Sequence, residues 1–173
     1  ETIFEGGRAT VERCPEDMVP LPGFCIDRYE APNQKGVRPL VAQGANEGEA
    51  WCALRGKRLC LQEEWIRACE GASKRKYPYG NRYRRGACND DKRYRPVSWS
   101  RINDTDCERG RRYIETLDQS DASGSRAECV SEEGVVDLAG NVSEWVNLSK
   151  PVRSGFAQGM VGCYWSGCYN MHK

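Results

Sequence analysis

The chain is 173 residues long, carries a net charge of +1 and contains ten cysteines, five tryptophans and eight tyrosines. Leu, Ile, Val and Phe number 28 of the 173 residues, about 16%, a share that indicates disorder only when the net charge is also high. The near-neutral charge argues against a disordered chain, and no apolar run approaches the roughly 20 residues of a membrane-spanning helix.

Short elements are predicted at the start of the chain. Residues 1–13 are polar and should form an N-terminal arm or an added edge strand, and a single domain is expected over 14–173. Two β-prone pieces, 18–20 and 24–30, are separated by residues that favour turns, among them Pro22 and Gly23.

Two helices are predicted next. The first covers 46–54, with Asn46 as its N-cap and Gly56 beyond its end. The second covers 62–69, where Trp65, Ala68 and Cys69 recur at the spacing of one buried face. From 71 to 135 we expect irregular, functional or disulfide-held loops, apart from short apolar pieces around 97–99 and 113–114.

The cysteines indicate the compartment. Ten is an even number and the cysteines are spread from Cys14 to Cys168, which favours disulfides and a secreted, periplasmic or cell-surface protein. A zinc site is the alternative, but there is no C-x2-C pair and His172 is the one histidine. Residues 1–5 lack the pattern of an export signal, so we expect a mature chain whose signal or anchor was removed or lies outside this sequence.

Positive charge is concentrated in residues 74–112. This basic segment holds 13 Lys or Arg against 5 Asp or Glu, a local net of +8, so the remainder sums to −7. Tyrosines interleave with the basic residues, as in grooves that bind single-stranded nucleic acid, but disulfides place the domain outside the cytoplasm and disfavour that partner. A protein, an anionic glycan or a lipid headgroup is the partner that we predict, and a solvated loop with inward-packed rings is the alternative.

Four segments in order resemble the signature of the formylglycine-generating enzyme (sulfatase-modifying factor) family over about 15–165, in a divergent, bacterial-type form. They are Ile26–Glu30, Gly56–Leu59 leading into Glu63–Trp65, Tyr77–Gly80, and Asp137–Trp145. The resemblance implies an α+β fold that is irregular, loop-rich and related to the C-type lectins, with short helices and short antiparallel strands stapled by disulfides. The chain stops before the family's Arg-rich strands and Gly-Phe-Arg ending, so we expect an incomplete or shortened domain.

The same resemblance implies structural calcium. Hard cations take carboxylate, amide and carbonyl oxygens, which the turn around Gly140 and Glu144 offers. Carried over by position, the ligands are main-chain oxygens near Ala139, Gly140 and Val142 with the Glu144 side chain, and a second site uses Asn89 with the Asp90 carbonyl. Alternatively, Asn141 and Glu144 satisfy backbone groups of a buried turn. Asn141 fits the glycosylation pattern, but a packed position predicts that it is unmodified.

Catalysis in this family uses a copper(I) ion held by two cysteine thiolates. Cys163 and Cys168 are similar in place to that pair and would be the catalytic copper ligands. The family's Arg-Gly-Gly-Ser stretch before the pair is absent, however, and a second register places neither cysteine at a catalytic position. Disulfide bonding of both is the favoured alternative.

Two functional hypotheses follow. The first is a non-catalytic binding or structural module on a cell surface, in the periplasm or in an extracellular assembly, which predicts no free thiols. The second is a copper-dependent oxidase that converts a sulfatase cysteine to formylglycine, which requires Cys163 and Cys168 as a reduced pair.

Overall fold

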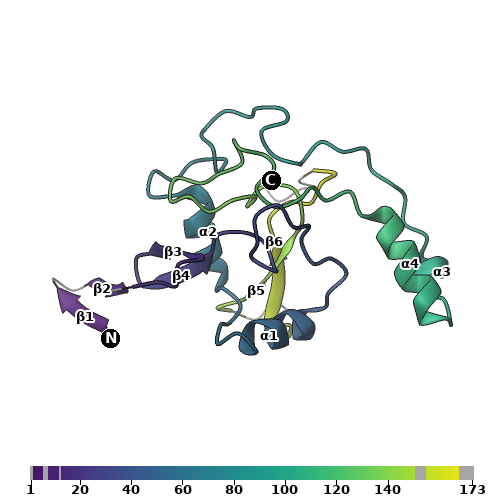
Figure 1. The fold of residues 1–173 in the computed structure, drawn as a ribbon, viewed down its shortest axis with the longest axis horizontal. Helices are drawn as coiled ribbons and strands as arrows, with labels where there is room; N and C mark the ends of the chain where they lie inside the picture. The colour runs from purple at the N-terminus through teal and green to yellow at the C-terminus, as the bar shows by residue number, and fades with distance from the viewer. Residues whose placement is uncertain (1, 6–7, 12, 151–154, 168–173) are drawn as a thin grey trace.

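The computed structural model describes residues 2–5, 8–11, 13–150 and 155–167, and long irregular segments connect its short helices and strands (Figure 1). Its strands form three separate antiparallel pairs: β1 (Thr2–Glu5) with β2 (Arg8–Val11), β3 (Met18–Leu21) with β4 (Phe24–Asp27), and β5 (Glu144–Asn147) with β6 (Gln158–Val161). The helices are α1 (Ala45–Ala53), α2 (Gln62–Glu70), α3 (Trp99–Ile102) and α4 (Cys107–Leu117).

The β3–β4 hairpin forms at the predicted turn. Leu21 pairs with Phe24, so Pro22 and Gly23 alone make the connection. Gly23 has a φ of +90°, as the third residue of a type II turn requires, and proline suits the second. Alternation along the strands then buries Val19, Leu21 and Ile26 on one side.

Helix α2 confirms the predicted second helix and supplies the centre of the core. The Leu61 N–H donates to Glu64 Oε2 at 2.8 Å at its start. Trp65 is 7% exposed and Ala68 is fully buried, so the predicted face is the buried one. The core joins this face to the β3–β4 hairpin, to the segment that precedes β5, and to β5 and β6; its members are Val19, Leu21, Ile26, Trp65, Ala68, Val135, Leu138, Val146 and Val161.

Helix α1 exists where it was predicted, but its predicted cap was wrong. Gly44 is the N-cap, because its N–H donates to Glu47 Oε2 at 2.6 Å. Asn46 lies inside the helix and is exposed. The helix ends at Ala53, Gly56 follows with a φ of +65°, and the Lys57 N–H donates to the Cys52 carbonyl at 2.9 Å. This is the hydrogen bonding of a glycine-terminated helix, and it turns the chain back across the end of α1.

Helices α3 and α4 correct the prediction of irregular structure over 71–135. Asp106 caps α4 by accepting the N–H groups of Glu108 and Arg109 at 3.0 and 3.3 Å. Gly110 lets the two helices approach, since a Cβ there would lie 2.8 Å from the Ile102 carbonyl oxygen. Helices α3 and α4 stand at one end of the molecule (Figure 1) and bury few side chains. Their sequence therefore shows little apolar periodicity.

The coarse fold prediction is confirmed: short helices, short antiparallel strands and disulfides, here Cys14–Cys25 and Cys88–Cys129. Kinship with the C-type lectins and the boundary at residue 14 stay predictions. Within the N-terminal arm, β1 and β2 pair with each other. Among the described residues, no helix has the length and apolar character to cross a membrane.

Candidate functional site

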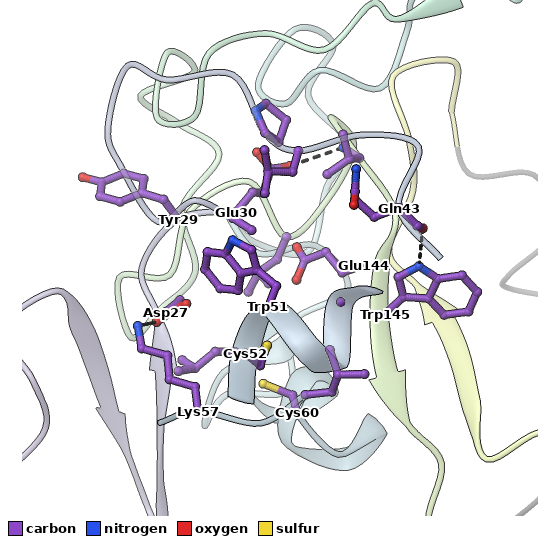
Figure 2. A pocket seen from close by; sticks show the side chains of 18 of the residues that line it. Asp27, Tyr29, Glu30, Gln43, Trp51, Cys52, Lys57, Cys60, Glu144 and Trp145 are labelled. Atoms are coloured by element: carbon purple, nitrogen blue, oxygen red, sulfur yellow. Dashed lines mark hydrogen bonds and ion pairs between the residues drawn. The ribbon is translucent and has the colours of Figure 1, made fainter. Parts of the chain in front are cut away.

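A pocket of about 200 Å³ opens between α1, the residues that follow β4 and the segment that leads into β5 (Figure 2). Trp51, Leu59 and Trp145 contribute apolar lining. Lys57, another lining residue, places its Nζ 2.6 Å from Asp27 Oδ1. The Trp145 Nε1 donates to the Gln43 carbonyl at 2.9 Å, which holds its ring in place. The pocket is thus largely apolar, and two carboxyl groups described next also line it.

Glu30 is the more deeply buried of these two carboxyl groups, with 5% of the residue exposed. Its Oε2 accepts the Ser123 hydroxyl at 2.8 Å and Asn141 Nδ2 at 2.6 Å, and its Oε1 accepts the Val142 N–H at 3.3 Å. Burial and the neighbouring Glu144 raise its pKa to about 8, and these hydrogen bonds oppose the rise. Glu30 therefore ties together three segments that are far apart in the sequence.

Glu144 and Asp137 extend this acidic cluster. Burial raises the pKa of Glu144 to about 7 although Trp65 Nε1 donates to Glu144 Oε2 at 3.0 Å, and Asp137 adds to the rise. Burial likewise raises the pKa of Asp137 to about 6, against a hydrogen bond from the Gly124 N–H at 2.7 Å. Burial disfavours the ionised form of each of the three carboxyl groups, and neighbouring carboxylates add to this effect.

Asn141 is the polar hub beside the cluster, only 2% exposed and at a φ of +60°. Its Nδ2 donates to Glu30 at 2.6 Å and to the Asp121 carbonyl at 3.2 Å. Its Oδ1 accepts Asn89 Nδ2 at 2.9 Å and the Asp121 N–H at 2.8 Å. Its main chain bonds to the Asn89 carbonyl and the Trp165 N–H. One side chain thus satisfies four polar groups from three other segments.

A tyrosine cluster lies in the basic segment. The rings of Tyr77 and Tyr79 stack at 5.5 Å between centroids, and Tyr83 lies 5.9 Å from Tyr77 and is half-exposed. The Arg84 guanidinium lies 4.9 Å above the Tyr79 ring and Lys76 Nζ 5.8 Å above that of Tyr77. Basic groups and aromatic faces therefore share one surface.

Three basic residues of this segment form ion pairs with acids outside it. Arg75 pairs with Glu132, Arg84 with Glu128 and Lys92 with Asp121. Part of the local charge is therefore neutralised within the fold.

The family model described as "Sulfatase-modifying factor enzyme 1-like domain" matches residues 32–165, more than half of the chain. The chain belongs to this family. It is also similar to the inactive Cα-formylglycine-generating enzymes 2 of Bos taurus and Mus musculus, 46% identical over 46 residues in each case. Those matches cover 26% of this chain and only 15% of each relative, so they concern one stretch of the relatives.

The residues predicted as calcium ligands for this family lie close together. A Cβ added to Gly140 would collide with the Asn89 carbonyl and come within 3.1 Å of the Asp90 side chain. Ala139 and Val142 lie in the same turn, and Glu144 begins β5. Both predicted calcium sites therefore lie in one region of the fold.

Calcium fits the oxygen chemistry of these residues. Asn89 Oδ1 is buried with no hydrogen-bond partner in the described part of the chain, and Glu144 is a half-buried residue whose carboxyl group has a raised pKa. No group of three or more His, Cys, Asp or Glu side chains among residues 13–150 and 155–167 is arranged for a metal. An ion would consequently need the main-chain carbonyl oxygens of the 139–142 turn, and calcium at these residues stays a prediction.

The predicted copper pair consists of Cys163 and Cys168. Cys163 is 8% exposed and disulfide-bonded, and Cys168 lies outside the described residues. The expectation of no free thiols was wrong, because Cys52, Cys60, Cys69 and Cys107 are free. Cys107 is exposed on α4, and the other three are half-buried in or beside α1 and α2.

Sequence reasoning missed the role of Glu30 and Asp137, although both stand in the family segments. Glu30 is buried by contact with residues about 90 or more positions away, and Asp137 accepts a hydrogen bond from a residue 13 positions away. The one signal in the sequence was that each acid stands at the end of an apolar, β-prone run, but acids in such positions are usually exposed.

Proposed function

We propose that this chain is a non-catalytic binding module of the formylglycine-generating enzyme family that works outside the cytoplasm. The observation that carries the proposal is the disulfide at Cys163. Copper(I) is bound by thiolates, and a sulfur in a disulfide has no negative charge to offer. The name of the Bos taurus and Mus musculus relatives, inactive formylglycine-generating enzymes, points in the same direction.

The non-catalytic role is tested by direct assay. We would load the protein with copper(I), add oxygen and a sulfatase-type peptide that contains cysteine, and look for the aldehyde by mass spectrometry. We expect none, either from the wild type or from Cys163→Ser. Aldehyde formed by the wild type and lost in Cys163→Ser would establish the oxidase instead.

The location outside the cytoplasm is supported by the disulfides Cys14–Cys25 and Cys88–Cys129 in addition to Cys163. Such bonds persist in oxidising compartments. Fractionation of cells that make the complete protein provides the test: recovery of the protein in the cytosol with these cysteines reduced would contradict the proposal.

Calcium is the cofactor that we propose for the Ala139–Glu144 turn and for Asn89 with the Asp90 carbonyl. Binding to the folded state alone raises Tm in proportion to the logarithm of ligand concentration. We expect millimolar calcium to raise Tm at pH 8 and magnesium to do so much less, because magnesium dehydrates reluctantly. Glu144→Gln should reduce the calcium shift, because it removes a ligand of one of the two sites, whereas Glu49→Gln, an exposed acid of α1, should retain the full shift. An unchanged wild-type Tm would refute calcium binding.

The basic segment is the partner surface that we propose, and an anionic glycan is the favoured partner. Tyr83, Arg82 and Lys76 lie exposed beside stacked rings, which suits a chain of sugars bearing sulfate or carboxylate groups. We expect retention on a heparin column that weakens with salt and falls in Lys76→Ala and Arg82→Ala. Lys35→Ala, at an exposed basic residue outside this segment, is the matched control. Equal elution of all variants would exclude this surface.

A further inference from the structure

Two free cysteines share the pocket described above, although the chain separates them by eight positions. Cys52 lies near the end of α1 and Cys60 just before α2, and both line the pocket. Figure 2 shows the two side chains as neighbours in the wall of the pocket. The hydrogen bond from the Lys57 N–H to the Cys52 carbonyl turns the chain back, and the Asn147 N–H donates to the Cys60 carbonyl at 2.8 Å. Backbone hydrogen bonds to their carbonyl groups therefore fix the positions of both cysteines.

We propose that Cys52 and Cys60 form a redox-active dithiol that closes to a disulfide at the pocket when an external disulfide accepts its electrons. In the structure both are free, so this is the reduced form. The proposal concerns neither Cys163 nor the calcium residues.

The reaction is a thiol–disulfide exchange. The Cys52 thiolate attacks one sulfur of the external disulfide, forms a mixed disulfide and expels one thiolate. The Cys60 thiolate then attacks the Cys52 sulfur and expels the second thiolate. The protein loses two electrons and two protons, and the external disulfide becomes two thiols.

The surroundings favour Cys52 as the first nucleophile. Burial raises the pKa of both thiols, that of Cys60 to about 12. Asp27 also raises the pKa of Cys52, while Lys57 and Arg55 lower it; Glu144 and Glu64 raise the pKa of Cys60, and Arg58 lowers it. Buried thiols of this kind react slowly until an oxidant reaches the pocket, which explains how a reduced pair can persist.

The test uses the complete chain, oxidised glutathione as the external disulfide and peptide mapping without reduction. Trypsin cuts after Arg55 and Arg58, between the two cysteines, so the disulfide appears as a linked pair of peptides. We expect that pair in the wild type and in Cys69→Ser, and its absence in Cys52→Ser and Cys60→Ser. The oxidised wild type should also melt roughly 5 °C higher than the reduced form, because a short loop is closed.

A second measurement uses the wild-type protein and so does not depend on whether a variant folds. Phenylarsine oxide bonds to two neighbouring thiols at once, so the native reduced protein should gain one arsenic with Cys52 and Cys60 protected together from alkylation. Independent alkylation of the two thiols in the presence of the arsenical would overturn the proposal. So would oxidation that links either cysteine to Cys69, to Cys107 or to a second chain.

Discussion

Removal of the Asn141 side chain is the most direct test of how this fold is held together. The side chain makes four hydrogen bonds, two to Asp121 and one each to Glu30 and Asn89. Substitution by glycine removes all four while the backbone keeps its φ of +60° without strain. Substitution by alanine removes the same bonds and adds the strain of a left-handed residue.

The expected loss follows from the groups left behind. Each buried donor or acceptor that loses its partner costs about 1–3 kcal/mol, and these groups act as one network, so the costs do not simply add. We expect Asn141→Gly to lower the free energy of unfolding by roughly 3–5 kcal/mol. Asn141→Ala should cost about 1 kcal/mol more, from the strained backbone.

Urea unfolding followed by tryptophan fluorescence, at pH 7 with a chelator and without reductant, measures both losses. Asn46→Ala is the control, because Asn46 is exposed in α1 and should change stability by no more than about 0.5 kcal/mol. A loss below about 1 kcal/mol in both Asn141 variants would show that water replaces the hub without cost, and the reasoning would fail.

Three further predictions concern the same region. Gly140→Ala should destabilise the fold by at least about 2 kcal/mol more than Gly36→Ala in urea unfolding, because the two φ values are +82° and +79° but only Gly140 faces a carbonyl, that of Asn89; equal losses would contradict the close approach. Without calcium, the free energy of unfolding should fall as the pH rises from about 5 to about 8, because folding raises the pKa of Glu144 from 4.5 to about 7 and the folded state holds this proton more tightly. Glu144 alone accounts for a fall of about 3 kcal/mol, and a free energy of unfolding that does not change with pH would refute the raised pKa. Trp65→Phe should cost about 1–3 kcal/mol, more at pH 8 than at pH 5, since it removes the hydrogen bond to the ionised Glu144; a cost independent of pH would show that this bond is not made to a carboxylate.

The sequence predicted those helices and turns whose own residues carry a periodic pattern or a turn signal. Helix α2 was predicted because Trp65 and Ala68 recur on one face. The turn between β3 and β4 was predicted from Pro22 and Gly23, and the structure shows that the two strands pair across it. Helix α4 was missed because Gly110 and Tyr113 are its only buried residues, too few to give a periodic pattern. Gly110 packs against α3, and the Tyr113 hydroxyl accepts the N–H of Ser98, just before α3.

The candidate site was likewise predicted only in part. The turn from Asp137 to Glu144 was recognised from its residues, and the structure places Asn89 directly against it. The state of its acids was not predictable, because the pKa values of Glu30 and Glu144 are raised by burial among distant segments. The pairing of cysteines was also open, since five pairs can be drawn in many ways from spacing alone.

The amino-acid sequence by itself determined the family, the disulfide-forming character and the oxygen-rich turn at Gly140, because these depend on residue types at fixed spacing along the chain. Only the tertiary structure decided that Cys52 and Cys60 face the same pocket and that Glu30, Asp137 and Glu144 form one buried acidic cluster. Burial and electrostatic coupling arise from contacts between distant segments, and no local pattern in the chain specifies them.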